Sequence, residues 1–174
     1  MTDQEPRPAT QRDETRPDTF EIPKHFFGDL TNDFYAGIGR TAVLSALLED
    51  RFRTLLQAMT HKPQTAHSKD GATALIKATR RYALSLGNDW TAFDRFAERT
   101  ESAFELRNDL VHNLWQPKPG GQFFGHRTNR QSGISRTKFV SIDEVRDEVA
   151  ELVTLNREWR QWHMLAGALP FEAG

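Results

Sequence analysis

Residues 98–115 have the sequence "ERTESAFELRNDLVHNLW", and this stretch decides the expected fold. Its apolar residues recur at spacings of three and four, which is the spacing of an amphipathic helix. On a helical wheel, Arg107 lies near the middle of the apolar stripe, whereas His112 lies on the polar rim. An uncompensated guanidinium on a buried stripe costs on the order of several kcal/mol. Either a carboxylate pairs with Arg107, or the stripe is open at that point to a phosphate or to a partner subunit.

Similar apolar periodicity predicts four helices along the chain. They are expected near residues 30–60, 68–86, 89–116 and 141–163. The third should end at "QPKPGG", because the residue before a proline avoids helical geometry. The fourth has the clearest start. Ser141 is expected to cap it with Glu144 as the reciprocal partner, while Val140 packs onto Val145.

The segment between the third and fourth helices, residues 117–140, is rich in glycine and contains two short apolar or β-branched pieces. These features predict a hairpin or a long ordered loop. We therefore expect an all-α fold, an antiparallel four-helix bundle with a β-hairpin or loop insert between helices 3 and 4. Gly37 and Gly39 in the first helix should permit a close helix crossing.

The helical domain is expected to span residues 26–169, with tails at residues 1–25 and 170–174. The first 24 residues hold four prolines and ten charged residues and have almost nothing to bury. Such a segment cannot offset the entropy lost on ordering, so we expect it to be disordered.

The overall charge of the chain does not indicate a polyanionic partner, because its 174 residues include 23 Lys and Arg against 24 Asp and Glu. The local charge between the third and fourth helices does indicate such a partner. No acidic residue occurs between Asp109 and Asp143, and the interval contains Lys118, Arg127, Arg130, Arg136 and Lys138. These side chains are predicted to bind RNA phosphates without sequence preference. The alternative is a solvated loop.

Other classes of site and location are excluded or left without support. The chain has no cysteine, which excludes disulfides, thiolate zinc sites and a cysteine nucleophile. Its histidines are scattered and form no metal-binding motif, so we expect neither a metal nor another cofactor. There is no signal-peptide pattern and no apolar run of membrane-spanning length, which favours a cytoplasmic protein without membrane association.

The sequence "RNDLVH" at residues 107–112 resembles the signature of the HEPN superfamily. That signature is an Arg followed a few residues later by His, typically with Asn, Asp or His directly after the Arg. Asn108 occupies that position here. The setting is similar too, late in a helix that precedes an insert and a final helix. The resemblance covers residues 29–167 in architecture, but only the six motif residues carry it specifically.

The resemblance implies a homodimer packed through the third helix, with Arg107 and His112 as the catalytic pair and Asn108 orienting them. Many members of the superfamily are metal-independent endoribonucleases, often in toxin–antitoxin or phage-defence systems. Others have lost catalysis and bind nucleotides or partner proteins. Two functions therefore stay open. One is a ribonuclease or RNA-binding protein, and the other is a non-catalytic interaction or nucleotide-binding module with Arg107 in a structural ion pair.

A possible protein partner follows from a departure from the family pattern. Some members have a Tyr two residues after the His, which an antitoxin nucleotidyltransferase modifies. Leu114 occupies that position here, so the sequence does not support a partner of that kind. An antitoxin of another, unidentified kind stays open.

The motif residues suit the cleavage of single-stranded RNA without a metal. Imidazole titrates near neutral pH and can move a proton to or from a reacting oxygen. A guanidinium matches phosphate oxygens with two hydrogen bonds. Asn108 is one turn before His112 and could hold one ring nitrogen. Arg107 and His112 point about 140° apart on one helix, so a site shared across a two-fold axis is easier to form than a site within one chain.

Overall fold

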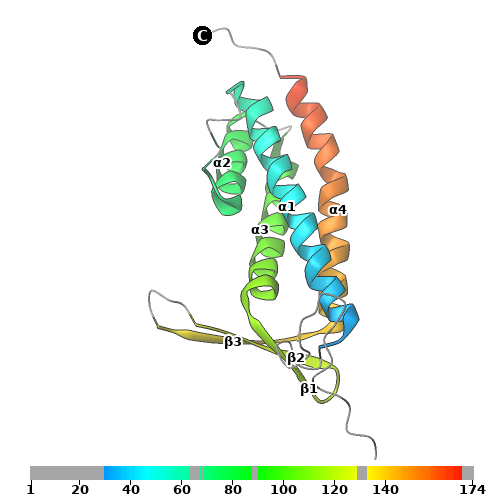
Figure 1. Cartoon of the computed structure of the whole chain (residues 1–174). Coiled ribbons are helices and arrows are strands. Elements are labelled where there is room, and N and C mark those ends of the chain that lie inside the picture. The colour runs from blue at the N-terminus through cyan, green and yellow to red at the C-terminus, as the bar shows by residue number, and fades with distance from the viewer. Residues whose placement is uncertain (1–29, 63–66, 68, 88–89, 129–132, 170–174) are drawn as a thin grey trace, which may run out of the picture.

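The computed structural model describes residues 30–62, 67, 69–87, 90–128 and 133–169. Its helices are α1 (Asn32–Thr60), α2 (Ala72–Ser85), α3 (Thr91–His112) and α4 (Ile142–Gly167). Its strands are β1 (Leu114–Lys118), β2 (Gln122–Thr128) and β3 (Ser135–Ser141), which form one antiparallel sheet in the order β1-β2-β3. The sheet lies at one end of the helices (Figure 1). The tails predicted at residues 1–25 and 170–174 lie outside the described residues.

The prediction of an all-α fold is wrong, because a three-stranded sheet follows α3. The chain leaves α3 after His112 instead of continuing to Gln116. Asn113 has extended backbone geometry (φ −85°, ψ 150°), and the indole Nε1 of Trp115 donates a hydrogen bond of 2.8 Å back to the carbonyl oxygen of Leu110. The residues expected to end the third helix therefore form β1, and the expected insert supplies β2 and β3.

The helix directions also correct the expected antiparallel bundle. Near their starts, α1 and α4 are joined by an ion pair between Asp33 and Arg146, with 3.3 Å between Oδ2 and Nη2. Further along both helices, the indole Nε1 of Trp159 donates to the carbonyl oxygen of Arg51 at 2.9 Å. The two helices therefore run parallel, and Figure 1 shows α3 running the opposite way. Because α3 ends where α1 begins, the sheet joins α3 to α4 at that same end of the bundle (Figure 1).

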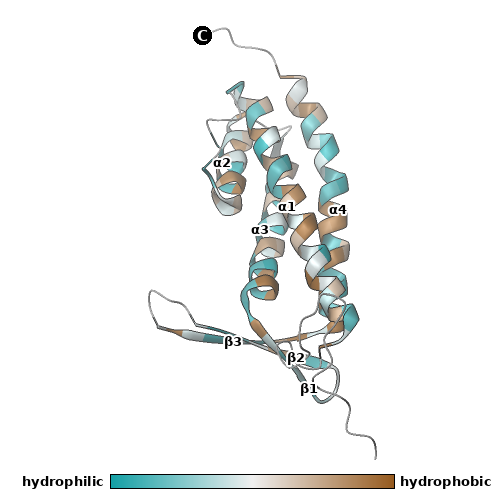
Figure 2. Cartoon of the chain, in the orientation of Figure 1, coloured by the Kyte–Doolittle hydropathy of each residue, from teal (hydrophilic) through white to brown (hydrophobic). Residues whose placement is uncertain are grey.

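Two clusters of buried side chains stabilise the structure. The larger lies among the four helices and includes aromatic contacts of Phe52, Phe93, Phe96 and Trp162. Along α1 and α4, apolar and polar residues alternate as expected for amphipathic helices (Figure 2). The smaller cluster joins the helix ends to the sheet, and we call it the junction cluster. It consists of Phe34, Leu110, Trp115, Phe123, Val140 and Val145. Among the described residues, no helix has the length and apolar character needed to cross a membrane.

The start of α4 confirms the sequence prediction. The Ser141 Oγ accepts a hydrogen bond from the Glu144 backbone N–H at 3.1 Å, and the Glu144 carboxylate accepts one from the Ser141 backbone N–H at 2.7 Å. Val140 and Val145 are both buried in the junction cluster. Because β3 passes directly into α4 through this cap, the cap fixes the sheet to the bundle.

The predicted close helix crossing is formed at one of the two glycines. Gly37 is buried on α1, and a Cβ atom there would overlap the Val145 side chain of α4. Val145 is buried and β-branched, so it has little freedom to move aside. A Cβ atom at Gly39 would meet nothing within 4 Å. The crossing therefore depends on Gly37 alone.

Replacement of these glycines should have opposite effects on stability. We expect Gly37→Ala to lower the free energy of unfolding by roughly 1–3 kcal/mol, the usual cost of overpacking a filled core. Gly39→Ala is the matched control and should raise it by roughly 0.5–1 kcal/mol through helix propensity. Urea unfolding of both variants measures the difference. A Gly37→Ala variant as stable as Gly39→Ala would contradict the close crossing.

Candidate functional site

Arg107 lies on the buried stripe of α3, as the sequence predicted, and is itself half-buried. The buried neighbours on this stripe are Phe93, Phe96, Ala97, Thr100, Ala103, Phe104 and Leu110. The Arg107 Nε donates to the Oγ of Ser45, a fully buried residue of α1, at 3.2 Å. Its Nη1 donates to the Oδ1 of Asn108 at 2.8 Å. No carboxylate of a described residue pairs with Arg107, so two neutral oxygens hold its guanidinium.

Asn108 and His112 are not joined as expected. The Asn108 Oδ1 accepts a hydrogen bond from Arg107, and Asn108 therefore positions the arginine. His112 is the last residue of α3, and its side chain is exposed. Within the described part of the chain, it forms no hydrogen bond or ion pair. The motif therefore provides a restrained arginine and a histidine that is open to solvent on another side of the helix.

Three of the predicted RNA-binding residues gather in one place, which we call the basic cleft. This cavity of about 280 Å³ is lined by Asp109, Asn113, Arg127, Ile134, Arg136, Thr137 and Lys138. Arg127 and Arg136 are directly opposite each other in the β2–β3 pairing. Like charges in that arrangement are destabilising. No described carboxylate forms an ion pair with either arginine, whereas the Lys138 Nζ lies 2.8 Å from the Asp109 Oδ2.

The other predicted residues lie elsewhere. Lys118 is on the opposite face of the sheet, where its Nζ is 5.4 Å from the centroid of the Phe124 ring. Arg130 is outside the described residues. Arg107 is also separate from the basic cleft, because Asp109 lies about 200° further around α3. The cleft is on the His112 side of the helix, since Asn113, the next residue, lines it.

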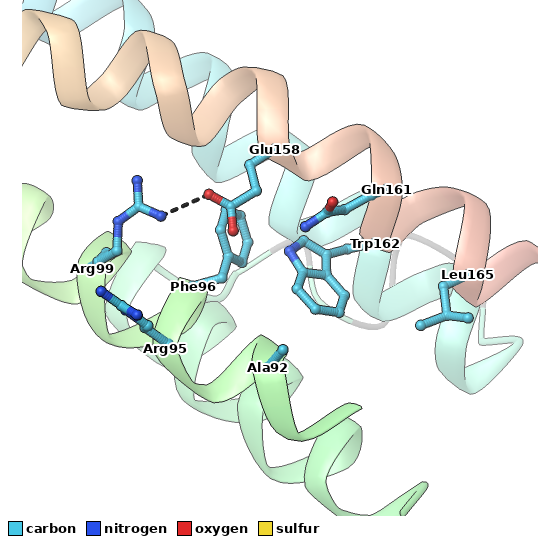
Figure 3. A pocket seen from close by; sticks show the side chains of 8 residues that line it. All are labelled: Ala92, Arg95, Phe96, Arg99, Glu158, Gln161, Trp162 and Leu165. Atoms are coloured by element: carbon cyan, nitrogen blue, oxygen red, sulfur yellow. Dashed lines mark hydrogen bonds and ion pairs between the residues drawn. The ribbon is translucent and has the colours of Figure 1, made fainter. Parts of the chain in front are cut away.

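A second cavity, of about 590 Å³, lies between α3 and α4. Figure 3 shows Arg95 and Arg99 of α3 facing Glu158 and Trp162 of α4 across it. The Arg99 Nη1 is 2.7 Å from Glu158, and its Nε is 2.7 Å from Glu151. Hydrogen bonds to Glu151 and Glu158 raise the pKa of Arg99 against the effect of burial. This arginine is neutralised by its ion pairs, and the cavity lies on the first half of α3, away from the motif.

Comparison of the chain with protein-family models, curated proteins and solved structures found no match. In the described part of the chain, no three His, Asp or Glu residues are grouped to hold a metal ion. The basic cleft offers guanidinium and ammonium donors, which suit phosphate or carboxylate oxygens.

Glu148 is a buried charged residue that the sequence analysis missed. It lies on α4 and is only 6% exposed, and its Oε1 has no hydrogen-bond partner. Burial, the larger cause, and the nearby Glu151 together raise its pKa from 4.5 to about 7, while Lys138 of the basic cleft opposes the shift. Its spacing provides a signal, because Glu148 falls on the buried stripe between Val145 and Leu152. Glu148 thus lies close enough to Lys138 of the basic cleft for their charges to interact.

This raised pKa makes the stability of the fold depend on pH. Between pH 4.5 and about 7 the folded chain holds a proton on Glu148 that the unfolded chain has released. The stabilisation is therefore complete below the unfolded pKa and is lost as the pH rises through the folded pKa. We expect Glu148→Gln, which stays neutral, to match the wild type near pH 4.5 and to exceed its free energy of unfolding by roughly 3 kcal/mol at pH 8.5.

Urea unfolding at the two pH values measures this effect. Glu105→Gln removes an exposed carboxylate from α3 and controls for the change in net charge. If Glu148→Gln lowered stability equally at both pH values, the carboxyl group would be stabilising in either protonation state, contrary to this account.

Proposed function

We propose that this chain is a HEPN-type, metal-independent endoribonuclease that acts on single-stranded RNA in the cytoplasm. Such an activity would suit a toxin or an antiviral defence protein, and an antitoxin of unidentified kind would be its partner. The observation that carries the proposal is the half-buried Arg107 within "RNDLVH", held by Ser45 and Asn108 without a described carboxylate. Of the four other half-buried arginines in the described chain, three, Arg53, Arg80 and Arg99, are each paired with an acidic residue that neutralises the charge. Without one, the guanidinium keeps its charge for a phosphate.

The proposed reaction uses the 2′-hydroxyl of the RNA as the nucleophile. The 2′-oxygen forms a bond to phosphorus, the bond from phosphorus to the 5′-oxygen breaks, and a cyclic 2′,3′-phosphate and a 5′-hydroxyl result. His112 takes the proton from the 2′-hydroxyl or gives a proton to the leaving oxygen, and its exposed position allows RNA to reach it. Arg107 stabilises the extra negative charge on the phosphorane-like transition state.

We further propose that the active form is a homodimer packed through α3. Arg107 points towards α1, whereas His112 points to another side of α3, about 140° away. Across a two-fold axis, Arg107 of one subunit can approach His112 of the other. The basic cleft would then bind the RNA backbone beside each site, mainly through Arg127 and Arg136.

A second candidate is an RNA-binding or nucleotide-binding module without catalysis. It is favoured by the hydrogen bond between Asn108 and Arg107, because that bond leaves His112 without a described partner to orient its ring. RNA binding without cleavage by the wild-type protein would select this candidate.

The proposed activity can be tested with purified protein and labelled single-stranded RNA in EDTA. We expect cleavage that leaves cyclic phosphate ends and that falls by roughly 10²–10⁴ in His112→Ala, since this variant has no general acid or base at that position. His163→Ala on α4 is the matched control, because the His163 ring stacks on Trp159 away from the motif. Equal cleavage by the wild type and His112→Ala would assign the activity to a contaminating nuclease.

The shared site can be tested with the same assay by mixing Arg107→Ala and His112→Ala proteins and allowing the subunits to exchange. Each mixed dimer then has one site with both residues and one site with neither. Because about half of the dimers are mixed, activity should recover to roughly a quarter of the wild-type level. Verified exchange without any recovery would rule out a site shared between subunits.

The basic cleft makes RNA binding depend on salt. We expect Arg127→Gln with Arg136→Gln to reduce the log–log salt slope by up to roughly 0.7 for each phosphate that the protein no longer neutralises. Lys77→Gln with Arg81→Gln on α2 is the control, since it removes the same charge from two exposed residues away from the sheet. Fluorescence anisotropy over a salt series measures the slope. Equal slopes in the two double variants would show that the cleft does not contact the backbone.

A further inference from the structure

The sheet has an outer face that is turned away from the junction cluster. Trp115, Phe123 and Val140 point to the inner face, so the residues that alternate with them point outward. The outer face consists of Leu114, Gln116, Lys118, Gln122, Phe124, His126, Thr137 and Phe139. No described helix packs on it, and the sheet lies across the end of the bundle with its inner face towards the helices (Figure 1).

Two aromatic rings lie side by side on this face. Phe124 of β2 and Phe139 of β3 are direct cross-strand partners, and their ring centroids are 5.2 Å apart with an interplanar angle of 54°. Phe139 is 55% exposed, although a phenylalanine is among the residues most often buried. On the other side of Phe124, the Lys118 Nζ is 5.4 Å from the ring centroid. An exposed ring, Phe139, and a half-buried ring, Phe124, are thus placed beside a cation.

The charge around these rings favours an anionic partner. The whole stretch from Leu110 to Ile142 contains no acidic residue, so the sheet carries only cationic charge. Rings beside cations match single-stranded nucleic acid, whose bases stack on aromatic side chains while its phosphates contact Lys and Arg. A stable protein interface buries about 800 Å² on each partner, which is more than the two rings and the exposed Leu114 of this face provide. The chemistry therefore favours nucleotides over a protein partner.

We propose that Phe124 and Phe139 form a stacking platform for the bases of single-stranded RNA, with Lys118 contacting the adjoining phosphate. The platform rests on the proposed function, because it supplies the substrate of that site. It selects RNA with unpaired bases, since the bases of a duplex are already stacked on one another.

The position of β3 links the platform to the basic cleft. This strand is at the edge of the sheet, and its side chains alternate between the two faces. Phe139 lies on the outer face, whereas Lys138 and Arg136 lie on the inner face and line the cleft. An RNA strand that crosses this edge would therefore stack its bases on one face and have its phosphates bound on the other.

The test uses full-length protein with His112→Ala as the background, so that bound RNA is not cleaved. The probe is a fluorescein-labelled 12-nucleotide oligouridine, and its Kd is measured by anisotropy. We expect Phe139→Ala to weaken binding roughly 5- to 100-fold, corresponding to the stacking of one base. Phe139→Trp should bind at least as tightly as the background. Phe139→Leu keeps an apolar side chain without an aromatic face and should weaken binding as Phe139→Ala does.

Two further measurements distinguish the platform from other uses of this face. An abasic oligonucleotide of the same length keeps the phosphates without the bases, and its Kd should not respond to Phe139→Ala. Met164→Ala is the control for the removal of an exposed apolar side chain, because Met164 is 74% exposed on α4. It should leave the binding of oligouridine unchanged.

Several outcomes would overturn the platform. Equal binding of oligouridine by Phe139→Ala and its background would overturn it while leaving the proposed function intact. A change of oligomeric state in Phe139→Ala, seen by sedimentation, would assign the face to a second copy of the chain. A large drop in thermal stability would assign it to another segment of the same chain, because exposed substitutions usually have little effect. Absence of RNA binding by the background protein would overturn both proposals.

Discussion

The junction cluster is the contact on which the arrangement of the site depends. It holds the sheet against the start of α1, the end of α3 and the start of α4. Phe34 stacks on Phe123 with ring centroids 3.8 Å apart and meets the edge of Trp115 at 5.5 Å. The Trp115 ring lies over Gly125, its cross-strand partner, where any Cβ atom would overlap the indole. These contacts hold the sheet against the end of α3, where the basic cleft forms between α3 and the strands β2 and β3.

The charge pattern of the sheet follows from how much of it this cluster covers. Along the inner face of β3, Val140 is buried in the cluster, Lys138 is half-buried, and Arg136 is exposed. Burial therefore ends partway along the strand, and cations occupy the positions beyond it. The same alternation places Phe139 on the outer face, away from the core. The inner face of the sheet thus has apolar residues that contact the bundle and cationic residues further along the strand, while its outer face has aromatic residues.

The features that the sequence could predict are the local ones. Helix periodicity located four helices, and it placed Arg107 correctly on the buried stripe of α3. The cap at Ser141 depends on residues only three apart, so its pattern is visible in the sequence. Even on α4, the burial of Glu148 was not predicted, although Glu148 lies on the same stripe as Val145 and Leu152. The cost of burying the Glu148 carboxyl depends on the neighbours that surround it in space.

The features that could not be predicted depend on residues far apart in the chain. Leu114 and Trp115 fit a helix as well as a strand, and the strand forms because β2 pairs with them. The parallel course of α1 and α4 is likewise seen in contacts between residues far apart in the chain, such as Arg51 and Trp159. The Asn108 side chain could form a hydrogen bond with the adjacent Arg107 or with His112 one turn further on, and the local spacing favours neither partner. The observed hydrogen bond to Arg107 agrees with the position of Ser45 on α1, which accepts a hydrogen bond from Arg107 and holds that side chain towards α1.

Comparison of the half-buried arginines explains why Arg107 is the centre of the proposed site. Arg53, Arg80 and Arg99 each form ion pairs with at least two carboxylates. Arg51 has no described carboxylate, but Asn156 accepts hydrogen bonds from it through both its backbone and side-chain oxygens, and the ring of Trp159 lies 5.1 Å away.

Arg107 resembles Arg51 in having neutral acceptors, one hydroxyl and one amide oxygen, but no aromatic ring of a described residue lies over its guanidinium. A carboxylate in their place would hold the guanidinium as firmly, but it would also compete with any phosphate for the same charge. Neutral acceptors fix the direction of the side chain and leave its charge available. A fixed guanidinium with an available charge would destabilise the fold if the arginine were purely structural. An arginine that must bind a phosphate requires this arrangement.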